Sequence, residues 1–253
     1  MRRKPRIALA QIKYFDINKK DNLEKILCFI HKAKKIGADI VCFPETCMLK
    51  EKYLDFKHDF LKEIQKACKE NEIWCIITED FMFKSGLYNT SVLIDRSGKI
   101  KGTYKKIKLY AEKGVTPGRN VKVFETDFGK IGIAICWDLA FPKLFKKMKN
   151  QGAQIVFCPS QWAYEEKAHD NAHEKRELSL LKSIIRSRAF ENLFFVCFCS
   201  PFRNEKDLIC YSAICSPHRI IKDIYDEEGL IYADLPLKKI KEFEKIYPGK
   251  EKA

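Results

Sequence analysis

The amino-acid sequence predicts an α/β fold, in which short β-strands alternate with amphipathic helices. Three observations carry this prediction. Apolar runs rich in Ile, Val, Phe and Cys recur along the chain, and segments with helical spacing of apolar residues lie between many of them. The composition agrees, because 46% of the 253 residues are hydrophobic and 32% are charged, which supplies a core and excludes a disordered chain.

Eight segments are expected to be strands, since each is a short apolar run bounded by turn residues or charges. In chain order they are Arg6–Ile12, Ile40–Phe43, Ile73–Thr78, Ser91–Ile94, Val121–Thr126, Lys130–Cys136, Ile155–Cys158 and Leu193–Cys199. Turn signals at Asp95–Gly98 and Asp127–Gly129 link adjacent strands, so hairpins are expected beside the strand–helix–strand units.

Four segments between these strands are expected to be helices. They are Asp21–Ile36, Phe56–Cys68, Pro142–Met148 and Leu178–Ala189. In the first, apolar residues recur at three- and four-residue spacing on one face. Asp21 followed by Glu24 resembles a capping box, and Gly37 is a natural residue for ending the helix.

A short internal repeat predicts how these elements are arranged. The segment Gly37–Glu45 resembles Gly152–Ser160, and each follows a helix that itself follows a strand. Two similar strand–helix–strand units indicate two sheets related by pseudo-symmetry, packed face to face with helices outside. No linker composition interrupts the chain, so residues 1–253 are expected to form one domain.

Charge and hydropathy narrow the classes of function. No apolar run approaches the ~18 residues needed to span a bilayer, and residues 1–15 lack a signal-peptide pattern, so no membrane and a cytoplasmic location are expected. The formal charge is +14, but the lysines are spread over helices and turns with acids between them. This pattern indicates a solvated surface with no specific nucleic-acid partner, although the charge could steer an anionic small substrate.

The 11 cysteines do not form a disulfide or metal pattern. Their number is odd and most lie inside apolar runs, where a free thiol acts as a small hydrophobic group. No CxxC pair is present, and Cys197 and Cys199 merely share one face of a strand. We therefore expect no metal site.

Three segments place a reactive residue at or near the end of an apolar strand, where parallel α/β folds bind ligands. They contain Glu45 after Pro44, Lys106 in a lysine cluster, and Cys136 before a turn into a helix. Cys136 is either a buried packing thiol or a nucleophile. The five histidines lie in helix or loop contexts, so a Cys–His pair is not favoured. A glutamate could instead accept the thiol proton while a lysine ammonium stabilises the thiolate and the oxyanion.

These segments together resemble the nitrilase superfamily of carbon–nitrogen hydrolases. The resemblance rests on Phe43–Glu45, Tyr104–Leu109 and Ile135–Asp138, in this order and over this length. Further matching segments extend along nearly the whole chain: Ile7–Gln11, Tyr88–Ser91, Pro117–Gly118, Arg188–Asn192, Glu228–Gly229 and Ala233–Leu235.

The resemblance implies a four-layer αββα sandwich and assigns roles to individual residues. Glu45 matches the general base, Lys106 the catalytic lysine and Cys136 the nucleophile. The backbone N–H of Trp137 would join Lys106 in the oxyanion hole. Glu112 falls at a second structural or catalytic glutamate, or is an ordinary loop carboxylate. The family uses no metal or organic cofactor, and its members form homodimers through outer helices or larger homo-oligomers.

The implied function is hydrolysis of a non-peptide carbon–nitrogen bond through a thioester on cysteine. The substrate is a linear amide or an N-carbamoyl amine; the stretch Tyr110–Lys113 places the carbamoyl branch slightly ahead. The alternatives are a nitrilase, an N-acyltransferase, or a catalytically silent binding protein on the same fold. Departures at Ala140, Lys143, Cys210 and Pro217–Arg219 concern the pocket wall and loops, so they bear on substrate rather than on chemistry. Substrate specificity is expected to rest on the loops Cys47–Asp55 and Gln161–Asp170.

Overall fold

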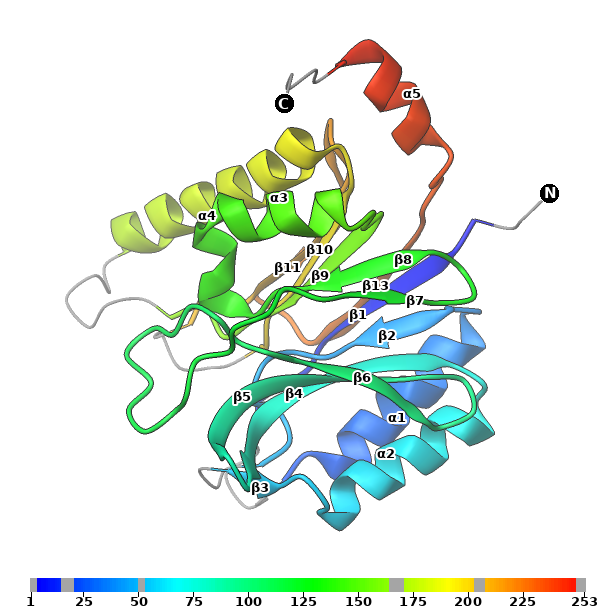
Figure 1. The fold of residues 1–253 in the computed structure, drawn as a ribbon, viewed down its shortest axis with the longest axis vertical. Coiled ribbons are helices and arrows are strands. Elements are labelled where there is room, and N and C mark those ends of the chain that lie inside the picture. The colour runs from blue at the N-terminus through cyan, green and yellow to red at the C-terminus, as the bar shows by residue number, and fades with distance from the viewer. Residues whose placement is uncertain (1–3, 15–20, 50–52, 164–170, 203–207, 249–253) are drawn as a thin grey trace.

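The computed structural model describes residues 4–14, 21–49, 53–163, 171–202 and 208–248, and these form two β-sheets packed face to face. Helices cover the outer face of each sheet, so the layers run helix, sheet, sheet, helix (Figure 1). The expected α/β class and the four-layer αββα sandwich are confirmed.

The strands of the first sheet follow a mixed order. In space they are β13 (Gly229–Asp234), β1 (Arg6–Gln11), β2 (Ile40–Cys42), β4 (Trp74–Phe83), β5 (Gly86–Ile94) and β6 (Ile100–Lys105), with β3 (Leu54–Asp55) beside β4. The second sheet runs β12 (Ile220–Tyr225), β11 (Tyr211–Cys215), β10 (Phe195–Cys199), β9 (Ile155–Pro159), β8 (Lys130–Ile133) and β7 (Val123–Glu125).

The helices are amphipathic and lie on the outside. They are α1 (Leu23–Lys35), α2 (Asp59–Glu70), α3 (Pro142–Asn150), α4 (Asn171–Asn192) and α5 (Lys239–Ile246), with a short 3₁₀ helix, η1 (Cys136–Ala140). Helices α1 and α2 cover the first sheet and α3 and α4 the second, while α5 extends from the body near the C-terminus (Figure 1). None of the helices in the described part of the chain is long and apolar enough to cross a membrane.

The two halves have matching topology, as the internal repeat predicts. In each sheet three parallel strands lie side by side: β1, β2 and β4 in the first, β8, β9 and β10 in the second. An antiparallel strand, β13 or β7, flanks this trio, and an antiparallel pair continues it on the other side. Strands β2 and β9, which carry the repeated segments, therefore occupy equivalent positions.

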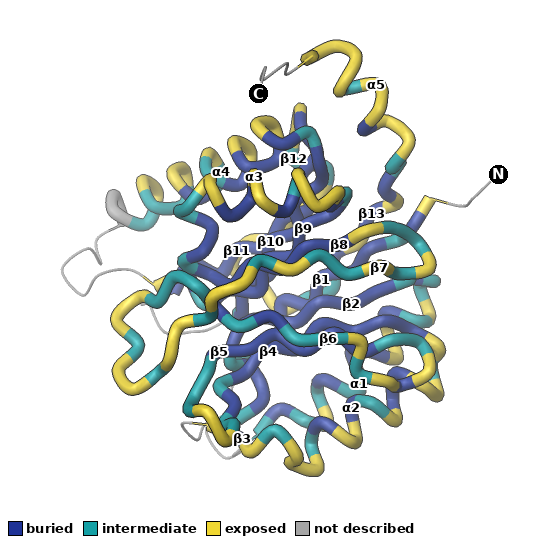
Figure 2. Tube along the Cα trace, in the orientation of Figure 1, coloured by how far each residue is buried: buried dark blue, intermediate teal, exposed yellow. Residues whose placement is uncertain are grey.

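The core has two parts because each sheet has two apolar faces. Ile7, Leu9 and Ile76 of the first sheet point toward the second sheet and join its core. Their neighbours Ala8 and Val41 face the opposite way, against α1 and α2. The central strands are buried, while the edge strands β7 and β12 and the outer faces of the helices are partly exposed (Figure 2). Burial on both faces explains why the parallel strands read as continuous apolar runs.

Several predicted boundaries are wrong for physical reasons. The β4–β5 hairpin extends well beyond its apolar runs, because Glu79 and Asn89 are buried polar residues with hydrogen-bond partners. Strand β8 ends at Ile133, before Cys136. Helix α1 begins at Leu23, two residues later than expected, and Asp21 Oδ1 accepts the Leu23 N–H at 3.0 Å from outside the helix. The chain also forms β3, β6, β11, β12 and β13, which the sequence reading did not identify.

Candidate active site

Glu45, Lys106 and Cys136 come together at the carboxyl ends of the parallel strands. Glu45 follows β2 of the first sheet, and Cys136 follows β8 of the second. The repeated strand ends meet here: the Glu45 N–H bonds the Ser160 carbonyl at 3.3 Å, and the Gln161 N–H bonds Glu45 Oε2 at 3.0 Å. The pseudo-symmetric packing of the sheets therefore joins residues that are far apart in the sequence.

The Lys106 ammonium is buried between two carboxylates. Its Nζ lies 2.8 Å from Glu45 Oε1 and also bonds Glu112 Oε1, and the residue is only 2% exposed. Burial alone would lower the pKa of Lys106, but Glu45, the Cys136 thiol and Glu112 outweigh it and raise this pKa well above its usual value. Lys106 is therefore protonated at neutral pH.

The backbone around Lys106 is fixed from two sides. Its N–H bonds the Asn89 carbonyl of β5 at 2.9 Å, and its carbonyl accepts the Gly118 N–H at 2.7 Å. A Cβ added at Gly118 would lie 2.2 Å from the Lys105 carbonyl oxygen, so only glycine allows this approach. The Pro117–Gly118 segment of the family resemblance thus has a structural reason.

The Glu45 carboxylate accepts three hydrogen bonds while almost completely buried. Oε1 accepts from Lys106 Nζ and from Asn89 Nδ2 at 2.9 Å, and Oε2 accepts from the Gln161 N–H. Together the three donors fix the orientation of the carboxylate. Sequence reasoning missed Asn89 and Gln161, although Asn89 lies in a segment of the resemblance and Gln161 directly follows the internal repeat.

Cys136 sits on a sharp turn between strand and helix. Its φ is 46°, in the left-handed region that residues other than glycine rarely adopt. Asp138 braces this turn: Oδ2 accepts the Ile135 N–H at 3.0 Å and the Tyr104 hydroxyl at 2.7 Å. Its Oδ1 accepts the Lys108 N–H at 2.8 Å, which joins the turn to the lysine-bearing loop. The contacts of Asp138 with two other segments cannot be seen from its place in the sequence.

Burial dominates the pKa of the Cys136 thiol and outweighs the lowering effect of the nearby Lys106. Burial and the charge of Glu45 raise the thiol pKa to about 12, although Lys106 opposes them. A nucleophilic role for this thiol would therefore require a base that removes its proton. Glu45 is the charged carboxylate whose field acts most strongly on the thiol.

Glu112 and Trp137 complete the predicted set. Glu112 Oε2 bonds the Tyr110 N–H while Oε1 bonds Lys106, so this glutamate ties the loop to the ammonium. The Trp137 ring is half-buried and packs with Tyr110 and Trp162. As one of the first N–H groups of η1, the Trp137 amide lacks a partner within the helix. Its oxyanion role stays a prediction.

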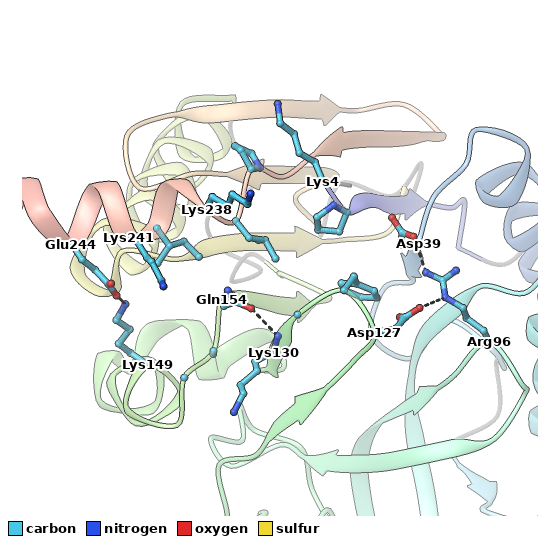
Figure 3. A pocket seen from close by; sticks show the side chains of 18 residues that line it. Lys4, Asp39, Arg96, Asp127, Lys130, Lys149, Gln154, Lys238, Lys241 and Glu244 are labelled. Atoms are coloured by element: carbon cyan, nitrogen blue, oxygen red, sulfur yellow. Dashed lines mark hydrogen bonds and ion pairs between the residues drawn. The ribbon is translucent and has the colours of Figure 1, made fainter. Parts of the chain in front are cut away.

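A different cavity, of about 1020 Å³, lies at the opposite ends of the strands (Figure 3). It is lined by Lys130 at the start of β8, by Gln154 before β9 and by side chains of α5. Arg96 there pairs with Asp39 and Asp127. None of the predicted catalytic residues lines this cavity. In the two expected specificity loops, residues 50–52 and 164–170 lie outside the described residues.

Comparison with known proteins points to one family. The carbon-nitrogen hydrolase family model matches residues 6–245. The chain is 28% identical to the omega-amidase NIT2 of Homo sapiens, covering 96% of this chain and 92% of the relative. It is also 28% identical to the deaminated glutathione amidase of Dictyostelium discoideum, covering 78% and 74%. The structure of Saccharomyces cerevisiae Nit3, from branch 10 of the nitrilase superfamily, has a TM-score of 0.83 at 23% identity, covering 99% and 96%.

Proposed function

The chain belongs to the carbon–nitrogen hydrolase family, and we propose that it is an amidase that uses Cys136 as its nucleophile. The observation that carries this proposal is the buried Lys106 ammonium, held between Glu45 and Glu112 beside a cysteine on a strained turn. A cluster of buried charges stabilises a fold poorly compared with apolar packing. Its presence at the strand ends therefore favours a chemical role.

The mechanism follows from the hydrogen bonds and charges of the site. Glu45 takes the proton of Cys136 as the sulfur attacks the amide carbon. Lys106 and the Trp137 N–H stabilise the oxyanion, each donor typically contributing ~3 kcal/mol to the barrier reduction. Glu45 then returns the proton to the leaving nitrogen, the carbon–nitrogen bond breaks and a thioester remains. Water, activated by Glu45, hydrolyses the thioester and restores the thiol.

The roles of Glu112 and Asn89 follow from their contacts. Glu112 orients the Lys106 ammonium from the side opposite Glu45, and Asn89 fixes the Glu45 carboxylate through Oε1. Neither interaction transfers a proton in this scheme. We therefore assign both residues to positioning the base and the ammonium.

Amides are proposed as the substrate class ahead of carbamoyl amines. Two relatives that align over most of the chain are named as amidases, an omega-amidase and a deaminated glutathione amidase. This outweighs the short stretch at Tyr110–Lys113 that resembles the carbamoyl branch. Nitriles rank third.

The test is ammonia release from matched linear amides, N-carbamoyl amines and nitriles by the purified protein. We expect the amides to be hydrolysed fastest, with acid and ammonia formed in equal amounts. An acid-quenched sample should carry the acyl group on the peptide that contains Cys136. Cys136→Ala should have no turnover, while Cys28→Ala, which removes an exposed thiol, should match the wild type. Turnover by Cys136→Ala above a few per cent would overturn the mechanism.

The remaining expectations concern the state of the protein. We propose that residues 1–253 form one domain, that the protein works in the cytoplasm, and that it has no specific nucleic-acid partner. All 11 cysteines are free thiols, which fits a reducing compartment. We also propose a homodimer or larger homo-oligomer, supported by the exposed Leu180 and Phe190 on α4. Light scattering during size-exclusion chromatography tests this, and a monomer at micromolar concentration would refute it.

A further inference from the structure

The candidate site contains a carboxylate that the proposed mechanism does not use. Asp80 of β4 lies opposite Asn89 of β5, and the Asn89 carbonyl in turn accepts the Lys106 N–H. Asp80 and Asn89 on β4 and β5, and Lys106 directly after β6, thus form one row across the sheet. Because side chains alternate along a strand, this row shares its face with the row two residues away, which contains Tyr104 paired with Ser91. Tyr104 points into the core between the sheets, so Asp80 faces the same interior.

Two oxygen atoms in this row have no hydrogen-bond donor among the described residues. They are Asp80 Oδ1 and Asn89 Oδ1, and both are buried. The other end of the Asn89 amide is engaged, since its Nδ2 bonds Glu45. Buried acceptors without a donor are rare in folded proteins and call for an explanation. A substrate that brings hydrogen-bond donors would supply the missing partners.

The charge of the row indicates what kind of donor fits. Burial and the nearby Glu45 raise the pKa of Asp80 to about 6, against the opposing effects of Lys106 and of the neighbouring Asn89 amide, so this carboxylate is mostly ionised at neutral pH. Lys106 is already shared by Glu45 and Glu112. The local field beside Asp80 is therefore negative although the whole chain carries +14. A cationic group is attracted to such a place, and a second carboxylate is repelled.

We propose that Asp80 and Asn89 form an acceptor subsite that binds an amino or ammonium group on the acyl part of the substrate. The inference rests on the proposed amidase function and names its substrate class: amides that carry an amine, in preference to amides that carry a carboxylate. Asp80 lies two strands from Lys106, roughly 10 Å across the sheet backbone. With the carbonyl oxygen held by Lys106, the amine belongs several bonds away from the scissile carbon.

The experiment compares three series of the same chain length: ω-aminoalkanamides, unsubstituted alkanamides, and monoamides of dicarboxylic acids. Each is measured for kcat/KM with the wild type and for binding by calorimetry with Cys136→Ala. The variants are Asp80→Asn, which removes the charge, and Asp80→Glu, which retains it. Glu125→Gln is the matched control, because it removes one exposed carboxylate from β7 in the other sheet.

We expect the wild type to prefer the aminoamide over the neutral amide, and Asp80→Asn to reduce this ratio about 10- to 100-fold, the usual size of a charge-assisted hydrogen bond. Asp80→Glu should retain part of the preference and Glu125→Gln all of it. Preference for the carboxylate series, or an unchanged ratio in Asp80→Asn, would overturn the subsite. An equal loss for all three series would also overturn it, because Asp80 would then act on Glu45 rather than on substrate.

The design separates this inference from the proposed function. If the wild type hydrolyses amides without preferring the aminoamides, the amidase proposal is supported and the subsite proposal is refuted. If Cys136→Ala binds aminoamides in a way that depends on Asp80, but the wild type hydrolyses no amide, the subsite proposal is supported and the amidase proposal is refuted. If Asp80→Asn does not fold, the wild-type order of the three series and its change in Asp80→Glu decide the question.

Discussion

Replacing Glu45 with Gln keeps the shape of the side chain but removes its ability to accept a proton, so it tests the proposed role of Glu45 as a base. The Cys136 thiol has a pKa raised to about 12, so at about pH 8 roughly one thiol in 10⁴ is ionised without help. Loss of the Glu45 charge lowers that pKa somewhat, since Glu45 is the second cause of the shift after burial. We therefore expect acylation by Glu45→Gln to be about 10³-fold slower than in the wild type.

The same reasoning predicts an unusual pH dependence for Glu45→Gln. Without a base, the rate follows the thiolate fraction, which rises about tenfold for each pH unit below the thiol pKa. Single-turnover acylation, followed by the mass of the acyl-enzyme between about pH 7 and pH 9, should therefore rise by about 10²-fold in the variant. Glu125→Gln should behave as the wild type. A Glu45→Gln rate within tenfold of the wild type, or one independent of pH, would refute the base role.

Glu45→Gln should also melt at a lower temperature, because the buried carboxylate has donors on both oxygens. An amide offers one oxygen and one NH₂ group, so it must turn the NH₂ toward either the Gln161 N–H or the Lys106 and Asn89 donors. One lost buried hydrogen bond costs about 1–3 kcal/mol, which corresponds to roughly 2–12 °C for a chain of this length. The kinetic comparison therefore belongs well below the melting temperature.

Three further substitutions test the surroundings of the nucleophile. Lys106→Arg should lower kcat by about 10²-fold or more and reduce thermal stability, because a planar guanidinium does not fit the space of a buried ammonium; normal steady-state rates would contradict this. Asp138→Asn should lower the free energy of unfolding, measured with denaturant, by about 2 kcal/mol. The carboxylate accepts the Ile135 N–H with one oxygen and the Lys108 N–H with the other, and an amide has only one oxygen, so its NH₂ group would face one of these donors. The substitution should also slow acylation about 10-fold or more, and an unchanged rate would remove Asp138 from the positioning of Cys136. Gly118→Ala should displace the Lys106 backbone, because the added Cβ would lie 2.2 Å from a carbonyl oxygen; activity is expected to fall about 10-fold or more, measured beside the melting curve.

The sequence predicts which strand ends carry the chemistry, because apolar runs that end in reactive residues are visible without a structure. Glu45 and Lys106 lie just after β2 and β6, whereas Cys136 lies in η1, beyond the end of β8 at Ile133. The register of β4 against β5 is not visible in this way, since both strands continue past their apolar runs through polar residues. The pairing of Asp80 with Asn89 therefore cannot be predicted from the apolar pattern of the sequence.

The state of the nucleophile also could not be read from residue types. A lysine near a cysteine indicates a lowered thiol pKa, but here burial and Glu45 together outweigh Lys106. The balance depends on how deeply three groups from two sheets are buried, which is a property of the packing. The brace formed by Asp138 is similar, because its partner Tyr104 comes from the first sheet while the turn it holds comes from the second.

The charges of the site give a reason for a protonated resting thiol. Lys106 already faces the carboxylates of Glu45 and Glu112, with Asp80 nearby, so a preformed thiolate would add negative charge to a buried region that has too much of it. Transfer of the thiol proton to Glu45 during attack leaves the total charge unchanged. The negative charge moves from the carboxylate to the substrate oxyanion, toward the ammonium. In this scheme Lys106 exchanges one anionic partner for another within the same buried site, so the charge of the ammonium stays balanced and little reorganisation is needed as the transition state forms. Apolar side chains of similar volume would stabilise the fold at least as well as these buried charges. The network is therefore better explained by proton transfer at constant charge than by a contribution to stability.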